Sequence, residues 1–207
     1  MPSIYNDNVF INCPFDQEYS LNLQSIVFTV YRCGFYPVSA LSEDNGLVNR
    51  LSKIEKLIEI SKYGIHDISR TELNSHGFPR FNMPFELGIF FGATRFGNRN
   101  QKSKNALIFE KTKFTYQNYL SDLSGIDTKA HENNPSAIIQ NIRDWLYASS
   151  RRASIPGHLT IIDDFTNWQT ILPVILQDSH LEMKSLTFND LYVIIIEEYL
   201  KTLLQQP

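Results

Sequence analysis

The stretch Gly64-Ile-His-Asp-Ile-Ser-Arg70, followed after a polar loop by Arg80-Phe-Asn-Met-Pro-Phe-Glu-Leu-Gly88, predicts the fold of this chain. Its first half has the apolar character of a buried strand that ends near Asp67. Its second half places Glu86 at the start of an apolar, glycine-bearing helix, where Pro84 is tolerated because an N–H is not needed in the first turn. A buried strand leading into such a helix is a unit of a layered α/β domain.

The segments on either side repeat this alternation of strand and helix. Gly34 follows the first helical pattern directly, as expected of a residue that ends a helix. Strands alternating with helices at this spacing imply right-handed crossovers, and therefore a three-layer α/β domain with a parallel five-stranded sheet over residues 1–148. Apolar runs predict strands over residues 9–13, 35–41, 63–69, 105–110 and 125–131, and helical periodicity predicts helices over 20–33, 47–58, 84–91 and 135–147.

The composition changes near residues 149–157, which have the serine, arginine, proline and glycine content of a linker. Beyond it, residues 161–176 and 191–204 are apolar enough for two helices, the second capped by Thr187 or Asn189. A run as apolar as that of residues 191–196 must be covered. We therefore expect residues 149–207 to form a helical extension that packs on the domain or on a partner.

Composition narrows the class of protein. The chain has 207 residues, 43% of them apolar and 20% charged, which is typical of a soluble globular protein. Its formal charge of -3 does not favour a nucleic acid partner. Its start has no basic segment followed by an apolar run, and no stretch approaches the roughly 20 apolar residues of a membrane span, so we expect a cytoplasmic protein with no membrane contact. Cys13 and Cys33 lack metal-ligand spacing, so we expect reduced structural cysteines and no metal.

Polar residues follow three of the predicted strands. Parallel sheets bind ligands at the carboxyl ends of their strands, near the point where the strand order reverses. We therefore expect one pocket that gathers all three loops. The residues are Asp16, Glu18 and Tyr19 after the first strand, Ser42, Glu43, Asp44 and Arg50 after the second, and Asp67, Ser69, Arg70, Arg80, Asn82 and Glu86 after the third.

Glu86 is the strongest candidate for chemistry. A carboxylate in the first turn of a helix is held ionised by the N–H dipoles, by about 0.3–1 kcal/mol when exposed and up to ~2 when partly buried. Gly88 and Gly92, one turn apart, would let this helix approach the sheet or a ligand closely. The alternative is that Glu86 only caps its helix and the glycines only pack, and the spacing alone leaves both open.

The other candidates each have two interpretations. Asp67 would bind ribose hydroxyls, or it would cap the loop that follows it. Arg70 and Arg80 would hold phosphate or carboxylate groups, or they would pin the long loop. Phe15 and Tyr19 would stack on a base, or they would belong to the core.

His66 stands apart from these candidates. Side chains alternate along a strand, so His66 and Asp67 point to opposite faces of the sheet. We therefore expect His66 to be a core or interface histidine whose hydrogen bonds are satisfied.

Three motifs carry a resemblance to a known family. The chain resembles bacterial TIR-like proteins and their relatives, the nucleoside 2-deoxyribosyltransferase-like N-glycosidases, over about residues 8–146. The resemblance implies a flavodoxin-like fold in which a glutamate at the head of the helix after the third strand carries the chemistry, here Glu86. The motifs are Val9-Phe-Ile-Asn-Cys-Pro-Phe-Asp16 with Tyr19, Ile65-His-Asp-Ile-Ser69, and Arg80-Phe-Asn-Met-Pro-Phe-Glu-Leu-Gly88, within which Asn82–Gly88 is the most specific.

The resemblance also implies an activity, that of an N-glycosidase hydrolysing NAD at the nicotinamide–ribose bond as a toxic effector of bacterial antiviral defence. NAD would be the substrate and no cofactor is needed. Assembly as a homo-oligomer, or with a partner protein of the defence system, would be expected. Because the pyridinium is already cationic, it leaves as a neutral base without a general acid, and one carboxylate suffices to stabilise the oxocarbenium-like transition state.

Two other functions remain open. A nucleoside or nucleotide N-glycosidase, or a deoxyribosyltransferase, would need an acid to protonate the departing base, and Asp67 or Asp16 would have to supply it. A non-catalytic nucleotide sensor or interaction module would use the same pocket without turnover.

Overall fold

The computed structural model describes residues 5–70, 72–73, 77–191, 199–200 and 203. Within them, five strands form one parallel sheet in the order β2-β1-β3-β4-β5, which is the flavodoxin-like order and confirms the expected fold class. The strands are β1 (Asn8–Asn12), β2 (Tyr36–Val38), β3 (Tyr63–Asp67), β4 (Asn105–Glu110) and β5 (Lys129–Ala130). The helices are α1 (Ser20–Arg32), α2 (Arg50–Glu59), α3 (Asn82–Phe96), α4 (Pro135–Ser150) and α5 (His158–Asp178).

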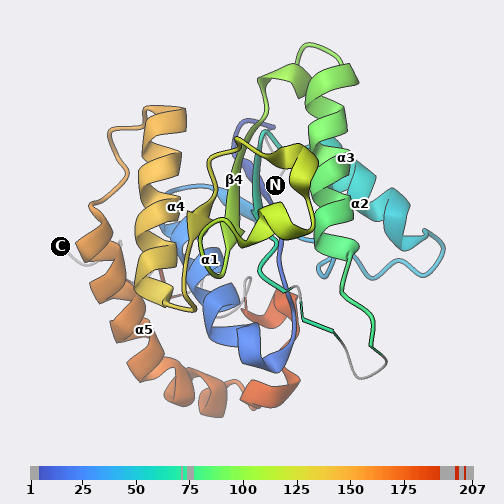
Figure 1. Ribbon diagram of the computed structural model, residues 1–207. Helices are drawn as coiled ribbons and strands as arrows, with labels where there is room; N and C mark the ends of the chain where they lie inside the picture. Colours follow the sequence, from blue (N-terminus) through green and yellow to red (C-terminus); the bar gives the residue numbers. More distant parts are fainter. Residues whose placement is uncertain (1–4, 71, 74–76, 192–198, 201–202, 204–207) are drawn as a thin grey trace.

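The sheet is covered on both faces, with α1, α4 and α5 on one side and α2 and α3 on the other (Figure 1). Side chains alternate along β1, so that Val9 and Ile11 pack toward α1 while Phe10 packs toward α2 and α3. Every residue of β1 and β3 is buried. This double burial explains why these strands are short continuous apolar runs.

Local sequence signals end and begin the helices as expected. After α1, the N–H of Phe35 donates to the carbonyl of Val30 over 3.1 Å, and Gly34 takes a φ of +80°, which is the Schellman arrangement. Asn49 caps α2 by accepting from the N–H of Ser52 over 2.9 Å. The first cap lies at the amino edge of the sheet, where the chain enters β2, and the second sets where the loop after β2 ends.

Both edge strands are shorter than predicted. The prediction of residues 35–41 for the second strand was wrong beyond Val38, because β2 pairs only with Asn8–Phe10 before the chain turns at Ser39. The prediction of residues 125–131 for the fifth was likewise too long, because β5 pairs with only Phe109 and Glu110. An edge strand has one neighbour, so its length follows that neighbour rather than its own apolar run.

Several helix boundaries differ from the expected ones. Leu47 lies outside α2 and is 97% exposed, because the cap at Asn49 starts the helix after it. The helix α4 continues to Ser150, and the chain leaves it at Arg151, whose φ is +56°. Most of the helix expected over residues 191–204 lies outside the described residues.

The C-terminal region packs on the domain's main core. Trp168 and Phe165 of α5 contact the Phe28 ring of α1, with centroids 5.6 and 5.4 Å apart. Arg32 Nε of α1 lies 2.8 Å from Asp164 Oδ2. Buried side chains between residues 161 and 200 therefore extend the core that covers the α1 face of the sheet.

Candidate functional site

The carboxyl edge of the sheet has a switch point at β1. The chain leaves β1 toward α1 on one face and leaves the adjacent β3 toward α3 on the other (Figure 1). Open parallel sheets bind ligands in the crevice outside such a point. The loops that follow β1 and β3 carry most of the candidate residues, so their contacts decide what the edge can do.

Asp16 joins the loop after β1 to the loop after β3. Its Oδ1 lies 2.6 Å from Arg70 Nη2, and its Oδ2 lies 2.9 Å from Arg80 Nη1. Arg70 Nη2 also lies 3.0 Å from Glu18 Oε2. Burial acts to raise the pKa of Asp16, but hydrogen bonding and charge from Arg70 outweigh it, so the pKa is lowered from its ordinary value.

These charged groups border an open cavity of about 390 Å³, which we call the charged cavity. The structure thus brings Asp16, Arg70 and Arg80 together from the loops after β1 and β3. No residue of the loop after β2 lines this cavity, so the expectation that one pocket gathers all three loops was wrong for it. Arg70 bonds two carboxylates through Nη2, and its buried Nε has no partner among the described residues. The Arg80 side chain is 49% exposed and bonds only Asp16 among the described residues. Arg80 therefore has donors left for a ligand. The cavity is lined by Asp16, Gln17, Glu18, Arg70, Glu72, Leu73 and Arg80.

Asp67 lies in a buried network on the α1 side of the edge. Tyr19 donates its hydroxyl hydrogen to Asp67 Oδ2, and the N–H of Ser69 donates to Oδ1 over 2.8 Å. His131 Nε2 also lies 3.1 Å from Oδ2, although its N–H is not aligned for a hydrogen bond. Asp67 and His131 are fully buried and Tyr19 is 2% exposed. This network, which we call the buried clamp (Tyr19, Asp67, Ser69 and His131), ties the loops after β1, β3 and β5 together.

The clamp changes the interpretation of two candidates. Asp67 is fully buried and lines none of the described cavities, so of its two interpretations the structure favours fixing the loop after β3 over binding ribose. Tyr19 packs edge-to-face on His131, with centroids 6.2 Å apart, and belongs to the core rather than to a stacking surface. His131 was not predicted as part of the edge. Only its position at the end of the fifth apolar run could have indicated it.

His66 lies on the other face, as strand alternation predicts. It is fully buried, and its Nδ1 lies 3.0 Å from Asn12 Nδ2, which also donates to the carbonyl of Met83 over 2.8 Å. Burial, with a smaller effect from Lys104, lowers the pKa of His66 to about 3, so it is neutral. The expectation of a core histidine fits its burial, but the expectation that its hydrogen bonds are satisfied was wrong for Nε2, which has no partner among the described residues. Asn12 fastens the first turn of α3 to the end of β1, which positions Glu86.

Glu86 lies in the second turn of α3, so the expectation that it occupies the first turn was wrong. The helix begins at Asn82, two residues before Pro84. Glu86 is 7% exposed and makes no hydrogen bond or ion pair with any residue that the structure describes. Burial raises its pKa to about 7, and the charge of Arg50 offsets this only in part. The carboxyl group is therefore poised to gain or lose a proton near neutral pH rather than held ionised.

The glycines of α3 do not bring the helix close to the sheet, which was one of the two roles expected of them. A Cβ added at Gly88 or Gly92 would meet no atom within 4 Å, so neither allows a close approach to the sheet. The tight position is Gly64 in β3, where a Cβ would lie 2.7 Å from both His66 Nε2 and the Phe90 ring. That glycine lets α3 pack closely over β3.

Cys13 marks the place where the carboxyl groups of the edge converge. Burial raises the pKa of its thiol well above the ordinary value, and the charges of Asp67, Glu86 and Asp16 add to this. The thiol is buried and free, so it stays protonated and inert. Glu86, although on the α3 face, thus belongs to the same edge as Asp16.

The remaining candidates lie at the surface of this edge. Phe15 is 37% exposed. Asn82 is exposed at the first position of α3. Ser69 is buried, yet it borders small cavities beside Lys111. None of the described cavities is lined by Glu86, which is 7% exposed.

A second cavity, which we call the large cavity, has about 440 Å³ and lies on the α1 side of the edge. One wall carries Phe15, Leu23 and Leu41, and the other carries Met183, Phe188 and Leu191 from the C-terminal region. No pattern in the sequence indicates that these C-terminal residues reach the carboxyl edge. Only the packing of α5 brings them there.

Neither a protein-family model nor a curated protein matches the sequence of this chain. In the described part of the chain, no three His, Cys, Asp or Glu side chains are grouped in a way that could hold a metal ion. Of the helices described, none has both the length and the apolar character to cross a bilayer. What the edge can do must follow from its own side chains.

Proposed function

We propose that this protein is a TIR-like N-glycosidase that hydrolyses NAD at the nicotinamide–ribose bond, with Glu86 as the working carboxylate. The observation that carries the proposal is an unpartnered, nearly buried carboxyl group beside the switch point of a flavodoxin-like sheet. The other fully buried carboxyl groups of this edge have partners. Among the described residues of this edge, Glu86 is the buried carboxyl group left for a ligand.

The chemistry suits one carboxylate. Water adds to the ribose carbon as the nicotinamide–ribose bond breaks, giving ADP-ribose, neutral nicotinamide and a proton. No acid is needed at the leaving group, and an ionised Glu86 stabilises the cationic ribose in the transition state. A pKa of about 7 in the free protein supports this role, because a cationic pyridinium beside Glu86 favours its ionised form.

We extend the proposal to a toxic effector of bacterial antiviral defence, acting in the cytoplasm as a homo-oligomer or with a partner protein. The motif resemblance suggests this setting. Two features of the molecule support association: Glu86 is nearly buried, and the neighbouring Phe81 and Phe85 are 64% and 56% exposed. Exposed aromatic side chains of this kind mark surfaces that pair with other proteins.

A second candidate function is cleavage of nucleosides or nucleotides, and the raised pKa of Glu86 favours it specifically. This reaction needs an acid for the departing base. Asp67 and Asp16 were the expected acids, but Asp67 is enclosed in the buried clamp and the pKa of Asp16 is lowered. Glu86, with a pKa of about 7, retains a proton to donate.

The test is product analysis after incubation of the concentrated protein with NAD and with a panel of nucleosides. We expect nicotinamide, and a loss of about 10²–10³-fold in rate for Glu86→Gln, since removing a single stabilising group has effects of this size. Glu55→Gln, on an exposed position of α2, is the matched control and should keep the parent rate.

Each other outcome has its own meaning. Free base from nucleosides with NAD untouched would favour the second candidate. Tight nucleotide binding without turnover would favour a non-catalytic sensor. A Glu86→Gln variant as active as the parent would remove Glu86 from both catalytic proposals.

A further inference from the structure

The large cavity is built from two parts of the chain that are distant in sequence. Phe15 and Leu41 come from the loops after β1 and β2, whereas Met183 and Phe188 come from the region after α5. Its volume of about 440 Å³ falls in the range of small-molecule sites. Mostly apolar walls with a few polar groups at the rim, including Gln17, are also typical of such sites.

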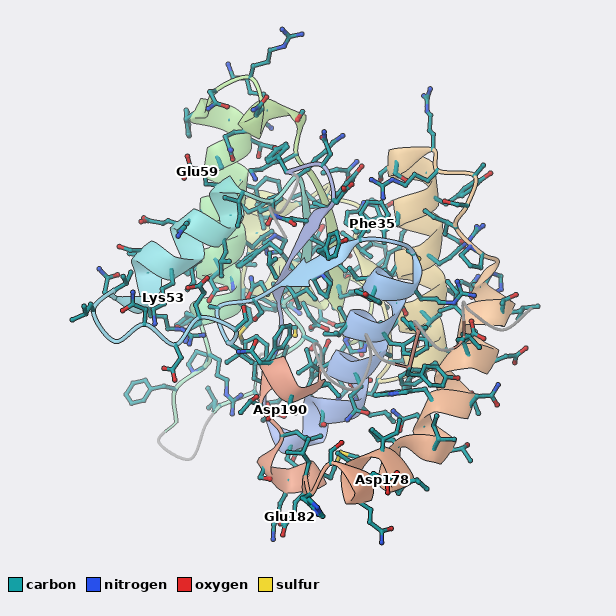
Figure 2. All side chains as sticks on the ribbon, turned by 180° about the vertical axis from the view of Figure 1, so that it is seen from behind. Phe35, Lys53, Glu59, Asp178, Glu182 and Asp190 are labelled. Carbon is teal, nitrogen blue, oxygen red and sulfur yellow. The ribbon has the colours of Figure 1, made fainter. Side chains whose placement is uncertain are left out.

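Residues 183–191 form one wall of the large cavity, which we call the C-terminal wall. Hydrogen bonds and packing hold this wall in place. Asn189 Nδ2 donates to the carbonyl of Ser42 over 3.3 Å, which links the wall to the loop after β2. Thr187 and Asp190 cap the turn that follows, each accepting a hydrogen bond from the backbone N–H of the other. Phe188 is 6% exposed and joins the main core. Figure 2 shows the chain running from Asp178 past Glu182 to Asp190, which lies near the N-terminal part of α1 at the carboxyl edge.

The large cavity adjoins the charged cavity, because Asp16 and Gln17 line both. The large cavity, on one side of this shared wall, is mainly apolar. The charged cavity, on the other side, is lined by Arg80, which bonds only Asp16 among the described residues. A ligand that spans the wall must combine a flat apolar ring with an anionic group. A nucleotide has this combination, with its base and its phosphate on either side of the ribose.

We infer that the large cavity binds the base of a nucleotide, and that the C-terminal wall therefore helps to select the ligand of the α/β domain. The identification of the ligand as a nucleotide rests on the proposed function. Glu86 does not line the large cavity, so the base held there is the one remote from the bond that breaks. For a dinucleotide such as NAD, this is the adenine.

Met183 and Phe15 offer the sharpest test, because both line the cavity from different parts of the chain and are 47% and 37% exposed, so that truncation spares the core. The probes are adenosine monophosphate and ribose 5-phosphate, which differ only in the base. Binding is measured by calorimetry on the full chain carrying Glu86→Gln, so that no ligand is consumed. Val174→Ala, at a 58% exposed position of α5 that lines no described cavity, is the control.

We expect adenosine monophosphate to bind at least about tenfold more tightly than ribose 5-phosphate, as burial of a base predicts. Met183→Ala and Phe15→Ala should each weaken adenosine monophosphate about five- to tenfold, with ribose 5-phosphate and the Val174→Ala control unchanged. In the parent background, the same two substitutions should raise the KM for NAD about fivefold with kcat unchanged, because they remove contacts made equally in the ground and transition states.

Equal binding of the two probes, or parent-like binding of adenosine monophosphate by both variants, would overturn the inference. The failure of the proposed function looks different. If the binding pattern holds but neither NAD nor nucleosides are cleaved, the base site stands and the glycosidase proposal falls. If NAD is cleaved with an unchanged KM in both variants, the glycosidase proposal stands and the base site falls.

Discussion

Asp67 and Glu86 are two buried carboxyl groups at one edge of one sheet, and they differ in almost everything else. Asp67 faces α1 and accepts hydrogen bonds from Tyr19 and from the N–H of Ser69. Glu86 lies on α3, on the other face, and no described residue bonds it. The comparison shows how the same chemical group serves as scaffold where partners surround it and as a reactive group where they do not.

Glu110 supports this distinction. It ends β4 at the same edge, and it accepts from the backbone N–H groups of Phe114 and Tyr116 over 2.9 and 3.1 Å and from the Thr128 hydroxyl. Glu110 is 1% exposed, so its carboxyl group, like that of Asp67, is buried and has hydrogen-bond partners. A buried carboxyl group normally has such partners, so the lack of partners at Glu86 is the exception that indicates function.

The largest expected effect is that of Asp67→Ala, which tests whether Asp67 stabilises the fold in a way that Glu86 does not. The substitution leaves the Tyr19 hydroxyl and the Ser69 N–H buried without an acceptor, so we expect a loss of about 3–4 kcal/mol in the free energy of unfolding. Chemical denaturation monitored by circular dichroism measures it. Glu86→Gln is the matched comparison and should lose none of this stability at pH 7. An Asp67→Ala variant as stable as the parent would show that the clamp is not a scaffold.

The free energy of unfolding should depend on pH through Glu86, which, unlike the enclosed Asp67, bonds no described residue. Its pKa is raised from 4.5 to about 7 on folding, so the folded protein keeps a proton that the unfolded chain releases between these values. Its contribution is therefore fully present below about pH 4.5 and is lost as the pH rises through about 7. The size of this loss is on the order of 2–3 kcal/mol.

Denaturation of the parent and of Glu86→Gln at a series of pH values measures this effect. We expect the two to diverge as the pH rises from 5 to 8, with the variant becoming the more stable. Arg50→Gln should steepen the loss, because Arg50 is the charge that favours the ionised form of Glu86. Parallel curves for parent and Glu86→Gln would mean that Glu86 is not the buried acid that distinguishes the α3 side.

The sequence allowed the central strands to be predicted closely, and the reason is physical. The strands β1, β3 and β4 are buried within the sheet, and their bounds lie within two residues of the predicted ones, although β3 ends at Asp67 rather than at Ser69. The strands β2 and β5 depend on one neighbour each. Alternation likewise placed His66 and Asp67 on opposite faces correctly. These features are local or have a fixed period.

The features that were not predicted depend on contacts between distant segments. The protonation of Glu86 depends on which groups pack around it, and the first turn of α3 starts two residues earlier than the position of Pro84 suggested. His131 joins Asp67 only because β5 brings the end of its loop to the same edge. The C-terminal wall reaches that edge only through the packing of α5. The periodicity of apolar residues in one sequence does not indicate which distant segments contact each other.

The smallest expected effect comes from removing one hydroxyl group of the clamp. Tyr19→Phe keeps the ring and its edge contact with His131 but leaves Asp67 Oδ2 without its closest donor, so we expect a loss of about 1–2 kcal/mol in the free energy of unfolding, as for hydrogen bonds to charged groups. Tyr116→Phe is the matched control, because that hydroxyl is equally enclosed but donates to the neutral carbonyl of Ile126 over 3.2 Å. It should lose only about 0.5–1 kcal/mol. An equal loss in both variants would mean that Asp67 is no more dependent on its partner than an ordinary carbonyl, and the contrast with Glu86 would then rest on burial alone.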